Sequence, residues 1–94
     1  MADIDVRPTG EDDEAFAFEV VVNEAGSSSR HVVSLRRADA AELGDGSARK
    51  ELLRRCFEFL LEREPKESIL AQFDVRDIGR YFPEFRIDQL LPER

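Results

Sequence analysis

The stretch that decides the fold is Ala15-Phe16-Ala17-Phe18-Glu19-Val20-Val21-Val22. Every second residue from Phe16 to Val22 is large and apolar, and the residues between them are Ala17, Glu19 and Val21. A period of two is the spacing with which side chains alternate between the faces of an extended chain. The stretch therefore predicts a β-strand with one heavily apolar face.

A second strand is predicted from His31 to Leu35, where Val33 and Leu35 alternate with Val32 and Ser34. The segment between the strands, residues 23–29, contains Asn, Gly and three Ser residues, which are typical of turns. We therefore expect an antiparallel β-hairpin. Because a two-stranded hairpin is only marginally stable in water, its apolar face must pack against another element.

The clearest helix is predicted at about 48–63, after the Gly44-Asp45-Gly46 break and with Ser47 as its N-cap. Its apolar residues cover roughly 200° of the helix surface; they are Leu52, Leu53, Cys56, Phe57, Phe59, Leu60 and Leu61. So wide a stripe predicts a central helix that is covered on two sides, by the hairpin and by the C-terminal segments. The remaining face carries charges of opposite sign four residues apart, Glu51 with Arg55 and Arg54 with Glu58.

The predicted fold class is α+β: an N-terminal antiparallel hairpin of two or three strands packs on this helix, and short C-terminal helices follow. Pro65 ends the long helix and can begin a short one through Gln72, while Asp74 is a second N-cap with Asp77 three residues on. We expect residues 1–94 to form a single domain, with residues 1–14 as a flexible acidic tail. Ile4 and Val6 alternate, so a short edge strand within that tail stays open.

Charge and composition limit the partners and the cellular compartment that we expect. The net charge is −7, which repels nucleic acid and anionic lipid at long range. No run approaches the ~18 apolar residues that a membrane helix needs, and Met1 to Thr9 lacks a basic region followed by an apolar one. The only cysteine, Cys56, cannot form an intramolecular disulfide, which is typical of a reducing compartment. We expect a cytoplasmic protein that does not bind membranes.

The C-terminal third resembles a pattern in small uncharacterised bacterial α+β proteins that also begin with a β-hairpin. The resemblance rests on Phe57-Glu58-Phe59-Leu60-Leu61-Glu62-Arg63-Glu64-Pro65, Ser68-Ile69-Leu70, Phe73-Asp74, Ile78 and Tyr81-Phe82-Pro83-Glu84-Phe85. It implies a bacterial, cytoplasmic setting, and it brings no activity, cofactor or catalytic residue.

Side chains that could carry chemistry are few. Cys56 lies within the apolar stripe of the helix, so we expect a buried core residue rather than a nucleophile. No motif places a serine or a carboxylate beside His31, so we expect a surface histidine at a turn. The acidic run Glu11–Glu14 lacks the spacing of a calcium loop. We therefore predict no catalytic residue, no cofactor and no metal site, and a protein that is not an enzyme.

Residues 81–85 gather three of the eight aromatic residues beside a proline, which is a composition suited to interface anchors. Core packing is the stronger expectation in so small a domain, with Tyr81 as the ring most suited to exposure and Phe85 as a second candidate. The arginines Arg76, Arg80 and Arg86 form the candidate nucleic-acid surface, although acidic residues lie among them.

The edge of the hairpin is a further candidate surface. Arg36 and Arg37 would either protect an unpaired edge or mark a docking rim, so the chain would be a monomer or a weak homodimer through the sheet edge. Our leading hypothesis is a non-enzymatic protein-interaction or regulatory module whose partner is another protein. The alternative is a nucleic-acid-associated regulator that uses Arg76, Arg80 and Arg86.

Overall fold

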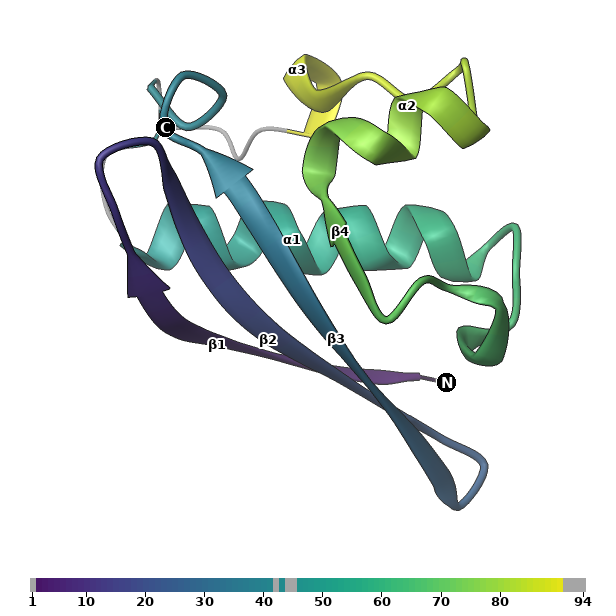
Figure 1. Cartoon of the computed structure of the whole chain (residues 1–94). Helices are drawn as coiled ribbons and strands as arrows, with labels where there is room; N and C mark the ends of the chain where they lie inside the picture. Colours follow the sequence, from purple (N-terminus) through teal and green to yellow (C-terminus); the bar gives the residue numbers. More distant parts are fainter. Residues whose placement is uncertain (1, 42, 44–45, 91–94) are drawn as a thin grey trace.

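The computed structural model describes residues 2–41, 43 and 46–90 (Figure 1). Three long strands come first, and one long helix follows them. The remaining elements are short. In chain order the elements are β1 (Asp3–Glu11), β2 (Ala15–Glu24), β3 (Ser27–Arg36), α1 (Gly46–Leu61), the 3-10 helix η1 (Lys66–Ser68), β4 (Gln72–Asp74), the 3-10 helix η2 (Val75–Asp77), α2 (Ile78–Tyr81) and α3 (Ile87–Leu90).

The predicted hairpin is formed by β2 and β3, which pair antiparallel. Its turn is much tighter than the predicted residues 23–29, because only Ala25 and Gly26 separate the strands. Both have positive φ, 53° and 81°, as in the two-residue turns whose twist matches that of the flanking strands. Glycine tolerates this conformation without a steric penalty. The strands therefore extend through residues that the sequence assigned to a loop.

The N-terminal segment is not the flexible tail that we expected from its charges. Asp3–Glu11 forms β1, which pairs antiparallel with β2 along the edge of the sheet. Val6 is buried opposite Val20, and Ile4 lies opposite Val22 and packs on the core. These two apolar side chains and the ladder with β2 outweigh the repulsion within the acidic run 11–14, which is exposed and of which only Glu11 lies in the strand.

The sheet has four strands in the order β1-β2-β3-β4, so the expected two or three strands were too few. β4 pairs parallel with β3, with Val33 opposite Phe73. A parallel neighbour requires a crossover connection, and α1 lies within that connection. The sequence hypothesis placed residues 65–72 in a helix, whereas only Lys66–Ser68 is helical and Gln72 begins β4.

The core lies between α1 and one face of the sheet, across which the helix runs (Figure 1). The inner sheet face is apolar as the alternation predicted: Phe18, Val20, Val22, Val33 and Leu35 are buried. α1 begins and ends two residues earlier than predicted, and it buries Leu52, Leu53, Cys56, Phe57 and Leu60. Farther along α1, Phe59 packs edge-on against Phe82 and Phe85, with centroids 6.0 and 5.1 Å away.

Candidate partner-binding cleft

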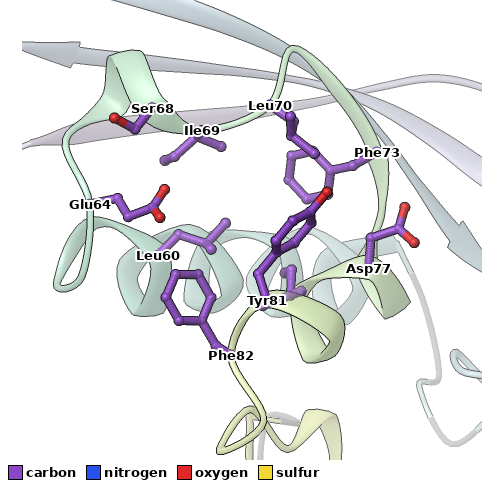
Figure 2. A pocket seen from close by; sticks show the side chains of 10 residues that line it. Leu60, Glu64, Ser68, Ile69, Leu70, Phe73, Asp77, Tyr81 and Phe82 are labelled. Carbon is purple, nitrogen blue, oxygen red and sulfur yellow. The ribbon is translucent and has the colours of Figure 1, made fainter.

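An apolar cleft lies where the C-terminal end of α1, the segment leading into β4, and α2 meet (Figure 2). Its volume is about 150 Å³. The apolar wall consists of Leu60, Ile69, Leu70, Phe73, Ile78 and Phe82, to which Tyr81 adds its ring. Three polar side chains, Glu64, Ser68 and Asp77, complete the lining. All of these residues come from the last third of the described chain.

The Leu70 wall is positioned by a buried histidine. His31 on β3 is only 2% exposed, so the expectation of a surface histidine at a turn was wrong. Its Nδ1 lies 2.8 Å from the carbonyl oxygen of Leu70 and therefore donates a hydrogen bond to it, because a carbonyl can only accept. In the neutral ring, Nε2 then accepts from the Ser29 hydroxyl at 2.8 Å. Packing of the ring against Phe57 at 5.2 Å completes its burial.

The side of the cleft that α2 forms is positioned by a capping box at the start of η2, the 3-10 helix that leads directly into α2. The Asp74 side chain accepts from the backbone N–H of Arg76 at 2.9 Å, and the Asp77 side chain accepts from that of Asp74 at 3.0 Å. The spacing of these two residues predicted this N-terminal cap, and the structure confirms it. Asp74 also accepts from the Ser34 hydroxyl at 2.6 Å, which joins the cap to β3. The short helix is thereby held in a fixed orientation on the sheet.

Two of the cleft's apolar residues are exposed to solvent. Leu70 is 48% exposed and Tyr81 is 63% exposed, and within the part of the chain that the structure describes Val32 is the third large hydrophobic residue of this kind. Core packing was the stronger expectation for the aromatic segment, but Tyr81, the ring that we considered most suited to exposure, is exposed. Phe85 is half-buried against Phe59 and lines a different groove, so the structure does not bring the two candidate aromatics together.

The two carboxylates of the cleft differ in their partners. Asp77 already accepts from the Asp74 backbone and lies 3.7 Å from the Arg80 guanidinium. The half-buried Glu64 has no ion pair with any residue that the structure describes, and its carboxylate points into the cleft (Figure 2). One end of the cleft is therefore neutralised within the molecule, while the Glu64 end carries a negative charge.

Two of the three candidate nucleic-acid arginines, Arg76 and Arg80, form ion pairs with acidic side chains. Arg76 contacts Asp39 at 3.0 Å, and the hydrogen bond that it donates to the Asp39 carboxylate raises the pKa of the Arg76 guanidinium. Arg80 pairs with Asp77, as noted above. Arg86 shares with Arg76 a groove that Phe85 and Asp39 also line. The structure brings Arg76 and Arg86 together, but a carboxylate accompanies them.

Arg36 is the last residue of β3 and Arg37 follows it, but β3 is not the edge of the sheet that the sequence suggested. β1 and β4, not β2 and β3, form the outer strands. Arg37 pairs with Glu11, donates to the Asp12 carbonyl at 2.7 Å, and lies 4.4 Å from the Phe16 ring centroid. Arg36 is exposed on β3 opposite Ala15. Arg37 thus fastens the β1–β2 connection rather than marking an open rim.

The free edge of β1 is the longer of the two outer edges. Pro8 has no N–H to offer a further strand, and the register with β2 shifts between Pro8 and Gly10. Irregularities of this kind interrupt edge-to-edge pairing. The edge that remains regular is the short segment from Asp3 to Arg7.

Groups suited to covalent or metal chemistry do not assemble in the described residues. Cys56 is fully buried in the core, as predicted, and burial raises the pKa of its thiol to about 12. Such a thiol is a poor nucleophile near neutral pH. Among residues 2–41, 43 and 46–90, no three His, Cys, Asp or Glu side chains lie close enough together to hold a metal ion.

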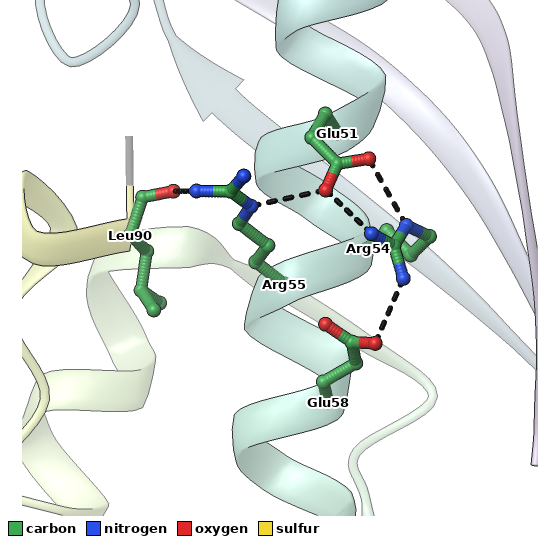
Figure 3. Close-up of polar contacts among 5 residues, drawn as sticks. All are labelled: Glu51, Arg54, Arg55, Glu58 and Leu90. Carbon is green, nitrogen blue, oxygen red and sulfur yellow. Dashed lines mark hydrogen bonds and ion pairs between the residues drawn. The ribbon is translucent and has the colours of Figure 1, made fainter. Parts of the chain in front are cut away.

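A charge network covers the outer face of α1 (Figure 3). Arg54 bridges Glu51 at 2.5 Å and Glu58 at 2.7 Å, and Arg55 bonds Glu51 at 3.0 Å, so both predicted pairs are present. The hydrogen bond from Arg54 is the main reason that the pKa of Glu51 is lowered. Arg55 also donates to the Leu90 carbonyl at 3.3 Å. This contact attaches α3 to α1, at a distance from the cleft.

Sequence reasoning missed three residues of the cleft region. Leu70 stood in a predicted helix, so nothing indicated its exposure, and Glu64 was one of many glutamates on a charged segment. Lys66 is a buried lysine, 5% exposed, whose Nζ bonds Glu67 at 2.6 Å. Pro65 was the one signal that could have indicated these residues. A proline favours a break in the helix, and after such a break different residues face the solvent.

Comparison of the chain with protein-family models, with curated proteins and with solved structures finds no match in any of the three. Of the helices in the described residues, none has the length and apolar character required to span a membrane. Function must therefore be argued from the cleft itself.

Proposed function

We propose that this chain is a non-enzymatic interaction module that binds another protein through the cleft between α1, the β4 segment and α2. The observation that carries the proposal is the convergence of Leu70 and Tyr81, two large and exposed side chains, on one concavity. Exposed apolar residues scattered singly need no explanation, but apolar residues grouped around a cleft are typical of interaction sites. Tyrosine is also enriched among the residues that dominate binding energy.

The rigidity of the cleft supports this role. The Leu70 carbonyl is bonded by His31, and Tyr81 ends α2, which continues directly from the 3-10 helix η2 that Asp74 and Asp77 cap. A preorganised surface loses little conformational entropy on binding, so more of the contact energy contributes to affinity. The second groove, around Arg76 and Arg86, gives less support to a nucleic-acid partner, because Asp39 pairs with Arg76 and the chain has a net charge of −7.

Affinity capture from native cell lysate tests the proposal. The tagged chain is compared with the double variant Leu70→Ser/Tyr81→Ser and with Val32→Ser, each with and without nuclease treatment. Val32 is a matched control, because it is 48% exposed like Leu70 but lies on the outer face of the sheet. Bound proteins are identified by mass spectrometry and measured against the bait.

We expect a stoichiometric protein that survives nuclease, binds the Val32→Ser variant as well as the wild type, and is lost from the double variant. Capture that the double variant retains would place the contact elsewhere on the molecule and contradict the proposal. Recovery of nucleic acid, or of proteins that vanish with nuclease, would support the nucleic-acid regulator instead.

A further inference from the structure

We infer that the cleft recognises a partner segment that inserts one apolar side chain and carries a lysine or arginine beside it, positioned to pair with Glu64. This inference rests on the proposed function and adds the chemistry of the partner. Three observations carry it: the volume of the cleft, the distribution of its carboxylates and the charge of the whole chain.

The volume of the cleft suits one inserted side chain better than a small-molecule ligand. Pockets for cofactors and drug-sized ligands typically measure about 300–1,000 Å³. The cleft measures about 150 Å³, and an apolar cavity of that size accommodates a single benzene ring. A leucine, isoleucine, methionine or phenylalanine side chain of a partner therefore fits, in contact with Leu60, Ile69 and Phe73 at the wall.

The two carboxylates of the cleft, Asp77 and Glu64, favour a positively charged group on the partner and indicate where it would lie. Asp77 is already bonded to the Asp74 backbone and paired with Arg80, so a cation from a partner adds little there. Glu64 lies at the other end, beside Leu60 and Ser68, with its carboxylate pointing into the cleft (Figure 2). When a partner covers the apolar wall, the Glu64 carboxylate loses water. A guanidinium or ammonium group then offsets that loss through a charge-assisted hydrogen bond.

The charge of the chain agrees with a basic partner. A net charge of −7 attracts positively charged segments at long range and raises their rate of association. A purely apolar partner gains nothing from this field, and an acidic partner is repelled. Both the local and the global electrostatics therefore favour an apolar residue that is accompanied by a basic one.

Selection from a random peptide library displayed on phage tests the inference, with the intact chain as immobilised target. Four targets are compared: the wild type, Glu64→Lys, Glu62→Lys and the double variant Leu70→Ser/Tyr81→Ser. Glu62→Lys is the matched control, since it makes the same change in net charge, its side chain is 76% exposed, and it does not line the cleft. Enriched peptides are then synthesised, and their affinity is measured by fluorescence anisotropy at low and high salt.

We expect the wild type and Glu62→Lys to enrich peptides that share an apolar residue with a lysine or arginine within three positions. Glu64→Lys should instead enrich peptides with an acidic residue at that position. For peptides selected on the wild type, Glu64→Gln should weaken binding by about fivefold at low salt and reduce the salt dependence, while the field of the remaining charges keeps part of it.

The remaining outcomes separate the two proposals. Apolar peptides with no charge preference, lost from the double variant, would overturn this inference and leave the proposed function standing. Peptides that bind the double variant as tightly as the wild type, or no enrichment on any target, would overturn both. A charge preference that changes equally in Glu62→Lys and Glu64→Lys would show that the whole-chain field acts alone, and it would overturn the role of Glu64.

Discussion

Residues 3–61 and residues 66–90 fold by different means. The first region consists of three long strands and one long helix, and a repeating apolar pattern buries their shared face. The second consists of elements of three or four residues each. Four apolar side chains of this region are buried in the core, namely Ile69, Phe73, Val75 and Ile78. Single polar contacts also position it, such as His31 with Leu70, the capping box of Asp74 and Asp77, and Arg63 with Glu84 at 3.0 Å.

The difference explains where the cleft lies. A long amphipathic element covers the surface that it meets, because its apolar side chains recur along its whole length. The elements after α1 are only three or four residues long and do not cover its C-terminal end completely, so Leu70 and Tyr81 stay exposed beside Leu60. The first region therefore acts as a rigid platform, and the second gives the molecule a surface that a partner can bind.

Removing the Phe57 ring should lower the stability most, because this ring packs against side chains of both regions. Phe57 is fully buried, and its ring lies 5.2 Å from His31 and 5.9 Å from Phe73. Phe57→Ala should lower the free energy of unfolding by about 3–5 kcal/mol, measured by urea denaturation. Phe59→Ala, at a half-buried ring facing Phe82 and Phe85, should cost clearly less. An equal cost at both positions would contradict the division into platform and attached segment.

Cutting the link between the two regions should have the next largest effect. His31→Phe keeps a buried ring but leaves the Leu70 carbonyl without its donor, which should cost about 1–3 kcal/mol of stability. Amide exchange measured by NMR should accelerate at residues 70–73 before the rest of the sheet. Ser29→Ala removes only the partner of the other ring nitrogen and should cost less. Unchanged exchange in His31→Phe would show that this hydrogen bond does not hold the segment.

Removing the cap should have a smaller and more local effect. Asp74→Ala deletes the acceptor for the Arg76 N–H and should cost about 1 kcal/mol, with faster amide exchange confined to residues 75–81. Ser34→Ala serves as the control, because it removes the hydroxyl that Asp74 accepts from and leaves the cap intact. If Ser34→Ala has the same effect as Asp74→Ala, the contact with β3 rather than the cap positions α2.

The charge network on α1 should give the smallest effect, visible mainly as a pH dependence. The pKa of Glu51 is lowered in the folded state from 4.5, chiefly by the hydrogen bond from Arg54. Its stabilising contribution is therefore complete above pH 4.5 and is lost as the pH falls through the folded value. The stability difference between wild type and Glu51→Gln, followed by thermal denaturation, should narrow over that window. Arg54→Gln should behave similarly, and a constant difference would contradict the coupling.

Much of the first region was predictable, because long periodic patterns leave few alternatives. The alternation from Phe16 to Val22 and the wide apolar stripe of α1 both predicted elements that the structure contains. The capping box at Asp74 and Asp77 was predictable for a similar reason, since it depends on a local spacing. Each of these signals is contained within one element.

The sequence-based prediction was incomplete or wrong for segments whose structure depends on contacts with another element of the fold. Residues 1–14 were expected to be a tail, with a short edge strand left open, and β1 forms because β2 offers Val20 and Val22 opposite Val6 and Ile4. β4 has only three residues, and it exists because α1 returns the chain to the side of β3. His31 looked like a surface residue because its acceptor, Leu70, is 39 residues away.

The sequence by itself determined the α+β class, the hairpin, the long helix and the burial of Cys56. These follow from local spacing and from the free energy of burying apolar surface. Only the tertiary structure decided the fourth strand, the burial of His31, the pairing of the arginines and the meeting of Leu70, Tyr81 and Glu64 in one cleft. Each of these depends on which distant segments the folded chain brings into contact, and the periodicity of a single segment carries no information about that choice.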